Sequence, residues 1–279
     1  MIRLRKISFK KITRQTLAIV EKELYLQFRY KSTIISQILN PLIQILILIF
    51  IFGIVFNIQA GYSLGYWTAS NYVLFILIAF CLQIFRPITE KYFQLFVVEK
   101  YWKTLSATLI APINKFSLLL GQLISWVILN SVGFIVVFVI ALMLYPIPIF
   151  YFLLFLLVFI CIWISFASIG LLMGVFGISN ENFGTSFSII LRFLFLFTCI
   201  NYPKEVFPQF IQFFILLNPF YYIVDLLRLI WYYGLNPTIA MTFITPVHII
   251  IFILSTVLLP IVSIAIFEYV YKRYGIAGY

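Results

Sequence analysis

Long apolar stretches with almost no charge constrain this chain more than any other feature; the clearest cover residues 34–56, 116–145, 149–176 and 246–271. A helix needs about 20 mostly apolar residues to cross a bilayer. Charged residues make up 10% of the chain, against roughly a quarter in soluble domains. So few charges cannot cover a water-facing surface, so most of the exterior must face lipid. The sequence therefore predicts an all-α, polytopic membrane protein.

Six transmembrane helices are predicted in this one chain. The 279 residues are taken up by these spans and their connections, so we expect a single transmembrane domain over 1–279. No room is left for a separate soluble catalytic domain. The six spans are expected near residues 34–56, 72–85, 116–145, 149–176, 183–200 and 246–271.

The basic residues are concentrated before the first span. Nine of the nineteen lysines and arginines fall within residues 1–32, whereas the opposite side is expected to carry only Lys204 and Arg228. Excess Lys and Arg marks the cytoplasmic side of a membrane, so both termini are expected in the cytoplasm. No basic strip interleaved with aromatic residues appears elsewhere. The pattern therefore favours membrane lipids as partners and argues against nucleic acid.

Residues 1–32 also carry an apolar stripe. Leu17, Val20, Leu24 and Phe28 fall on one helical face, a spacing typical of an amphipathic helix. We expect that helix to lie in the cytoplasmic interface of the membrane. The alternative is a solvated basic leader.

The segment 201–245 interrupts the apolar pattern. Its apolar stretches are too short to cross the bilayer and are separated by prolines, including Pro208 and Pro219. Because irregular backbone cannot stay unsatisfied in lipid, we expect a re-entrant helical hairpin on the extracellular side before the last span. Asp225 and Arg228 are three residues apart, which allows an ion pair on one helix. Both a structural role and contact with substrate stay open for that pair.

Residues able to carry enzymatic chemistry are scattered. The eight carboxylates form no cluster and His248 is the only histidine, so neither an acid–base site nor a metal site is predicted. His248 lies near the end of a predicted span, where a structural role is expected. The sequence contains no G-x-x-x-x-G-K-[ST] loop, so this chain cannot hold ATP in that way.

Two features inside the predicted spans bear on packing and transport. Arg192 stands alone in the fifth span, where a charge is costly. It either contacts a substrate headgroup in a pathway or bonds to carbonyls within the bundle. Gly170 and Gly174 form a small-xxx-small pair that predicts close helix packing, within one subunit or between two.

The polar break after the second predicted span carries the most specific string of the sequence. It begins Glu99-Lys-Tyr-Trp-Lys-Thr-Leu105 and continues through Ala111-Pro112-Ile-Asn-Lys115 to Leu120-Gly121-Gln122. A second string precedes the last span and reads Leu217-Asn218-Pro219-Phe220-Tyr221. In this order and with the six-span layout, the two strings resemble those of ABC type 2 transporter permeases.

The resemblance implies a transport subunit without its own ATPase. In such a system a separate ABC nucleotide-binding subunit binds ATP and Mg, and the permease chain itself holds no cofactor and no metal. A second permease copy completes the pathway, as a homodimer or a heterodimer. The location implied is a prokaryotic cell (inner or plasma) membrane, crossed several times.

The resemblance also suggests roles for particular residues. The cytoplasmic coupling segment would span 86–115, and Arg192 would be a candidate for the substrate pathway. The ATPase would dock on Glu99, Lys100, Trp102, Lys103, Thr104 and Leu105. The re-entrant hairpin would be shaped by Pro208, Asn218, Pro219, Asp225 and Arg228.

The expected substrate is an amphipathic molecule. The string 111–115 resembles that of the drug, lipid and lipooligosaccharide exporters more than that of the polysaccharide exporters. Export of a polysaccharide or O-antigen type glycan-lipid is the alternative within the family. Outside the family, the alternative is a membrane-embedded enzyme or scaffold that transports nothing.

Overall fold

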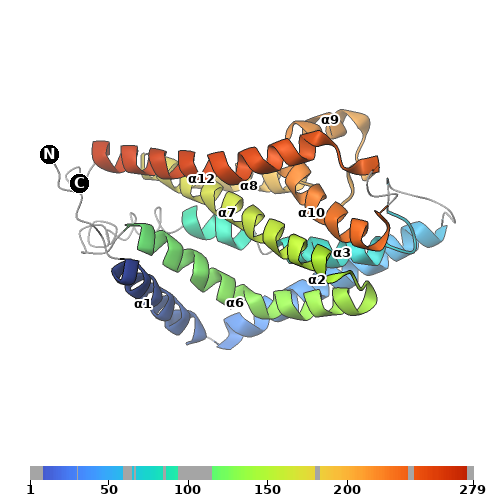
Figure 1. The fold of residues 1–279 in the computed structure, drawn as a ribbon, viewed down its shortest axis with the longest axis horizontal. Coiled ribbons are helices and arrows are strands. Elements are labelled where there is room, and N and C mark those ends of the chain that lie inside the picture. The colour runs from blue at the N-terminus through green and yellow to red at the C-terminus, as the bar shows by residue number, and fades with distance from the viewer. Residues whose placement is uncertain are drawn as a thin grey trace.

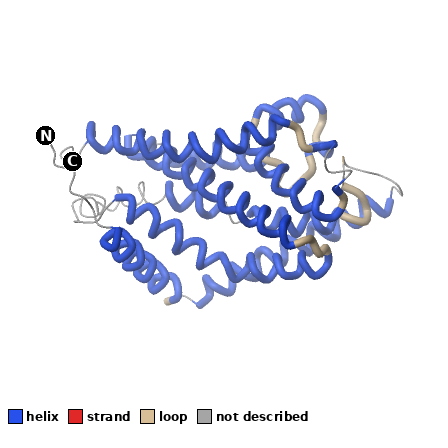
Figure 2. Tube along the Cα trace, in the orientation of Figure 1, coloured by secondary structure: helices blue, strands red, loops and turns tan. Residues whose placement is uncertain are grey.

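The computed structural model describes residues 9–29, 31–58, 65, 67–83, 86–93, 115–179, 183–237 and 242–274. Within these ranges the regular elements are helices (Figure 2), which confirms the all-α prediction. In chain order they are α1 Phe9–Phe28, α2 Lys31–Ile58, α3 Tyr72–Gln83, α6 Lys115–Leu144, α7 Ile149–Ser179, α8 Phe183–Phe197, the 3-10 helix η1 Lys204–Val206, α9 Gln209–Leu217, α10 Pro219–Leu235 and α12 Pro246–Tyr274.

Among the described residues, three helical stretches are long and apolar enough to cross a membrane: Tyr72–Phe93, Ile149–Phe176 and Pro246–Val270. Two helix pairs meet the same criterion but are bent, by 54° within α6 and by 91° between α9 and α10. Counting each pair as one span gives five. The apolar part of α2 is shorter, Leu42–Ile54, and α8 has 15 residues. The six-span layout therefore stays a prediction.

The second span is longer than the sequence predicted. We expected it to end at residue 85, but the helical stretch reaches Phe93. The first charged residue after residue 85, Arg86, had suggested that the span ends there. Its charge is paired within the helix, because Arg86 Nε lies 3.0 Å from Glu90 Oε1 one turn later. Arg86 therefore lies inside this candidate span, whereas the sequence placed it in the cytoplasmic break.

Residues 86–93 pack directly on α7. The Thr89 hydroxyl donates to the Phe166 carbonyl at 3.2 Å. A Cβ added at Gly170 would lie 2.5 Å from the Thr89 carbonyl oxygen, so only glycine permits this approach. At Gly170, the close packing predicted from the small-xxx-small pair thus occurs within one subunit.

The bend in α6 has a local cause. It falls between Ser131 and Gly133, and Gly and Ser weaken a helix at this kind of position. The Ser131 hydroxyl donates back to the Ile128 carbonyl at 2.7 Å, and the Asn130 amide donates to the Trp126 carbonyl at 2.8 Å. Such back-bonding often accompanies a bent helix.

The turn between α9 and α10 is built around Asn218. Its side-chain oxygen accepts from the Phe220 amide at 3.1 Å and caps α10, whose first residue is Pro219. A proline is well suited to that first position. The Asn218 side-chain amide also donates to the Thr198 hydroxyl at 3.2 Å, so the turn is tied to the chain just after α8.

The helices form one bundle with two distinct ends (Figure 1). The end that carries α1 and the start of α6 also carries the C-terminal end of α12, whereas α9 and the bend into α10 lie at the opposite end. Both ends of the described chain therefore lie at one end of the bundle. Which side of the membrane that end faces stays a prediction.

The most continuously buried stretches of the core lie in α10 and α3. Nearly all of α10 from Phe220 to Tyr232 is buried, and so is α3 from Leu74 to Leu82. By contrast, α12 exposes most of its length. A mostly exposed apolar helix in a membrane protein faces lipid or another subunit.

Candidate functional site

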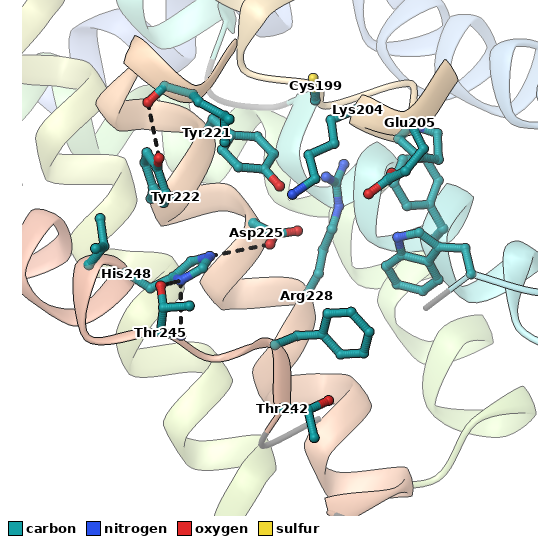
Figure 3. Close-up of a pocket in the computed structure, with 16 residues that line it drawn as sticks. Cys199, Lys204, Glu205, Tyr221, Tyr222, Asp225, Arg228, Thr242, Thr245 and His248 are labelled. Carbon is teal, nitrogen blue, oxygen red and sulfur yellow. Dashed lines mark hydrogen bonds and ion pairs between the residues drawn. The ribbon is translucent and has the colours of Figure 1, made fainter. Parts of the chain in front are cut away.

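The first polar site is a cavity of about 390 Å³ between α10, η1 and the start of α12, which we name the hairpin cavity. In Figure 3 side chains from all three elements point into it. Ionisable side chains are rare in this chain, yet this cavity gathers Lys204, Glu205, Tyr221, Asp225, Arg228 and His248.

His248 joins the last helix to α10. Its Nε2 lies 3.3 Å from the Asp225 Oδ2, and its Nδ1 lies 2.8 Å from the Thr245 hydroxyl oxygen. The Thr245 backbone N–H also donates to Nδ1, at 3.3 Å. Because Nδ1 accepts this bond, it carries no proton, and the ring proton is on Nε2. The Nε2–H group therefore donates a hydrogen bond to the Asp225 carboxylate. This arrangement agrees with the structural role predicted for His248.

The same residues form the start of α12. Thr245 precedes Pro246, and the His248 side chain, three residues after Thr245, reaches back to the Thr245 N–H. This bond is one half of a capping box, with histidine in place of the usual Glu or Gln. One imidazole therefore both caps a helix and links that helix to its neighbour.

Arg228 is buried, with 1% of its surface exposed. Its guanidinium lies 4.2 Å from the Phe75 ring centroid and donates to the Ile200 carbonyl. The ion pair that the sequence allows between Asp225 and Arg228 stays a prediction; the structure gives each of them a contact on another element. The charges of α10 thereby hold α3, the chain after α8 and α12 around it.

Glu205 is half-buried at the rim of the hairpin cavity. A Cβ added at Gly65, which has a φ of 65°, would lie 2.9 Å from Glu205 Oε1. Burial raises the pKa of Glu205 above its usual value, and the nearby cation Lys204 opposes that shift. The Lys204 ammonium lies 5.4 Å from the Tyr221 ring centroid.

The second polar site is a groove of about 480 Å³ between α2, the span Tyr72–Phe93 and α8, which we name the mid-span groove. Its polar residues come from the middle of each element: Gln44 from α2, Gln83 and Arg86 from the second span, and Arg192 from α8. Asn201 and Tyr202 line one end. Its walls are apolar and include Ile47, Leu48, Phe195 and Leu196.

The mid-span groove opens on the surface of the subunit. Gln44, Arg86 and Arg192 are exposed, although they belong to elements that we expect in the bilayer. Arg192 has no ion pair with a carboxylate within the described part of the chain. A charge in mid-bilayer costs roughly 2.5–3.5 kcal/mol or more. These side chains must therefore meet water, protein or a ligand.

Sequence reasoning found Arg192 and missed its neighbours. Gln44 and Gln83 are single amides in apolar runs, and Arg86 was placed in the polar break after the predicted second span. A polar residue within each of three predicted spans (Gln44, Gln83 and Arg192) was the available signal. Their convergence in one groove depends on tertiary packing and could not be obtained from spacing.

The predicted coupling residues Glu99, Lys100, Trp102, Lys103, Thr104 and Leu105 lie outside the described residues. The structure therefore leaves their docking role a prediction. Among the residues that are described, no group of three or more His, Cys, Asp or Glu side chains could hold a metal ion.

Comparison with known proteins gives one informative match. No curated protein matches the chain. The model of the family described as ABC-2 type transporter matches residues 14–232, which is most of the chain. The matched range contains the mid-span groove and most of the hairpin cavity. The chain therefore belongs to the ABC-2 type transporter family and is a membrane subunit, the transport permease, of an ABC transporter.

Proposed function

We propose that this permease exports an amphipathic molecule along a pathway formed between two permease copies. The mid-span groove is the single observation that carries the proposal. It places exposed polar side chains against apolar walls in elements expected to cross the bilayer, and an amphipath needs both kinds of surface. The groove is open on one subunit, and a second copy facing it would enclose a route.

The energy for export would come from a separate ABC ATPase docked on residues 99–105. Two observations support this part of the proposal: the family match and the resemblance of that string to the coupling segment. The docking surface would be cytoplasmic, on the same side as both termini. A homodimer is the simplest assembly, and a heterodimer with a related permease would serve the same mechanism.

The decisive experiment is reconstitution with an ABC ATPase encoded in the same genome. We expect the two proteins to co-purify, and ATP to drive movement of a fluorescent lipid or drug across the vesicle membrane. Arg192→Leu should reduce that movement while membrane abundance stays unchanged. A complex that hydrolyses ATP but moves no amphipath would contradict the proposal, as would full export by Arg192→Leu.

The docking surface has its own test. Glu99→Lys or Lys103→Glu should uncouple ATP hydrolysis from transport, because charge reversal opposes a complementary surface. Glu21→Lys, on the exposed face of α1, is the matched control and should leave coupling intact. Normal ATPase binding and coupling in both reversed variants would remove residues 99–105 from the interface.

A further inference from the structure

We infer that the mid-span groove binds the phosphate headgroup of an anionic amphipath, with Arg192 and Arg86 as its principal contacts. This inference rests on the proposed function and names the substrate class. It follows from the charge, the donor chemistry and the walls of the groove.

The charge of the groove is positive. Arg192 has no carboxylate partner among the described residues. Arg86 forms an ion pair with Glu90, with 3.0 Å between Arg86 Nε and Glu90 Oε1. Neither carboxylate of the hairpin cavity lines this groove. A neutral headgroup would leave the Arg192 charge uncompensated in the bilayer, whereas an anion removes that cost.

The donors suit phosphate. A guanidinium presents several N–H donors in a planar fork that matches phosphate and carboxylate oxygens. Here two guanidinium groups come from two different elements, and the Gln44 amide adds a donor from α2. The Gln83 side-chain amide already donates one hydrogen bond to Asn201 Oδ1 at 2.9 Å, which leaves its second N–H for a ligand. Donors that converge from three elements fit a tetrahedral group better than a planar carboxylate.

The size and the walls suit a headgroup with attached chains. About 480 Å³ accommodates a phosphate headgroup but not a whole lipid. Ile47 and Leu196 are 53% and 44% exposed beside the polar residues. Acyl chains would lie along this apolar rim while the phosphate stays at the arginines.

Binding to the full chain in neutral detergent tests the inference without the ATPase. The probes are dioctanoyl phosphatidic acid, dioctanoylglycerol with the same chains and no phosphate, and glycerol phosphate with the same headgroup and no chains. We expect phosphatidic acid to bind well above the other two. Arg192→Gln should weaken it about tenfold, as expected for loss of a charge-assisted hydrogen bond, and adding Arg86→Gln should weaken it further.

Two control variants separate charge from general damage. Arg192→Lys should retain most of the affinity because it keeps the charge, and Arg14→Gln removes an exposed arginine of α1 outside the groove and should change nothing. Equal binding of dioctanoylglycerol, or full affinity in Arg192→Gln, would overturn the inference. Equal binding of glycerol phosphate would also overturn it, because the site would then accept a soluble phosphate.

The outcome is distinguishable from failure of the proposed function. If the reconstituted complex exports an amphipath but phosphatidic acid binds no better than dioctanoylglycerol, the headgroup assignment fails and the exporter stands. If phosphatidic acid binds as expected but ATP moves no amphipath, the exporter fails and the groove holds a resident lipid. If Arg192→Gln breaks the permease dimer with binding unchanged, Arg192 belongs to the subunit contact and the inference fails.

Discussion

The hairpin cavity and the mid-span groove use the same kinds of side chain in opposite ways. In the hairpin cavity Asp225, Arg228 and His248 are buried and bonded across α10, α12 and the chain after α8. In the mid-span groove Arg86 and Arg192 are exposed on elements expected in lipid. Buried charges that are bonded to neighbouring elements fix a structure, whereas an exposed charge such as Arg192, which has no carboxylate partner among the described residues, demands one in a membrane. The hairpin cavity and the mid-span groove therefore differ in the burial of their charged residues rather than in residue type.

The largest expected effect tests this separation directly. Replacing Arg228 with Met should lower the free energy of unfolding by about 3–5 kcal/mol, because one member of a buried charged network is lost. Arg192→Met is the matched variant and should leave stability nearly unchanged. Thermal unfolding of the purified chains compares them, and equal destabilisation would show that the two regions do not differ in this way.

A second variant disturbs the mid-span groove through the packing of residues 86–93 on α7. Gly170→Ala would place a methyl group 2.5 Å from the Thr89 carbonyl oxygen, so residues 86–93 must move. Overpacking of this kind costs about 1–3 kcal/mol, and the shift should also displace Arg86 and weaken phosphatidic acid binding. Gly53→Ala, where the nearest atom is the Tyr72 hydroxyl oxygen at 3.3 Å, provides a milder control. Unchanged stability and binding in Gly170→Ala would contradict the tight packing.

The contact between α10 and α12 through His248 should contribute less to the free energy of unfolding than Arg228 does. His248→Ala removes the bond to Asp225 and the cap at Thr245, and we expect a loss of about 1.5 kcal/mol. His248→Gln can retain one of these bonds and should lose less. Denaturant unfolding of the two variants measures the difference, and the prediction fails if alanine and glutamine behave alike.

The smallest effect depends on pH. Burial raises the pKa of Glu205, so its charged form is penalised in the folded state. The protonated folded form is therefore favoured at low pH, and this stability is lost as pH rises through the folded pKa. Glu205→Gln should be slightly more stable than the parent chain at neutral pH, with the gap closing on acidification. A gap that is constant from pH 4 to pH 8 would exclude this origin.

The sequence predicted the membrane character and the helices from the length of the apolar runs, which is a local property. It also predicted that prolines break the segment 201–245 into short helices, and α9 and α10 meet there at a 91° bend. The central position of α10 was not predictable, since α9 is also an apolar helix and is exposed. Burial of α10 follows from contacts with α3, α7 and α12, which are distant in sequence.

The two sites were predictable to different degrees. The spacing of Thr245, Pro246 and His248 contains a capping-box pattern that a closer reading of the sequence could have found. The bond from His248 to Asp225 joins two helices and leaves no local signal. Arg86 was placed in the polar break because a charged run usually ends a span, and its partner Glu90 one turn later was not considered.

The contact between α1 and α6 has a mechanical consequence. A Cβ at Gly121 would lie 2.7 Å from the Ile19 Cβ, and the Ser117 hydroxyl donates to the Ile12 carbonyl at 3.3 Å. Helices this close cannot slide past each other without a clash, so they move together. The expected coupling segment ends at Lys115, where α6 begins. A movement of that segment would therefore displace α1 and α6 together as one rigid unit.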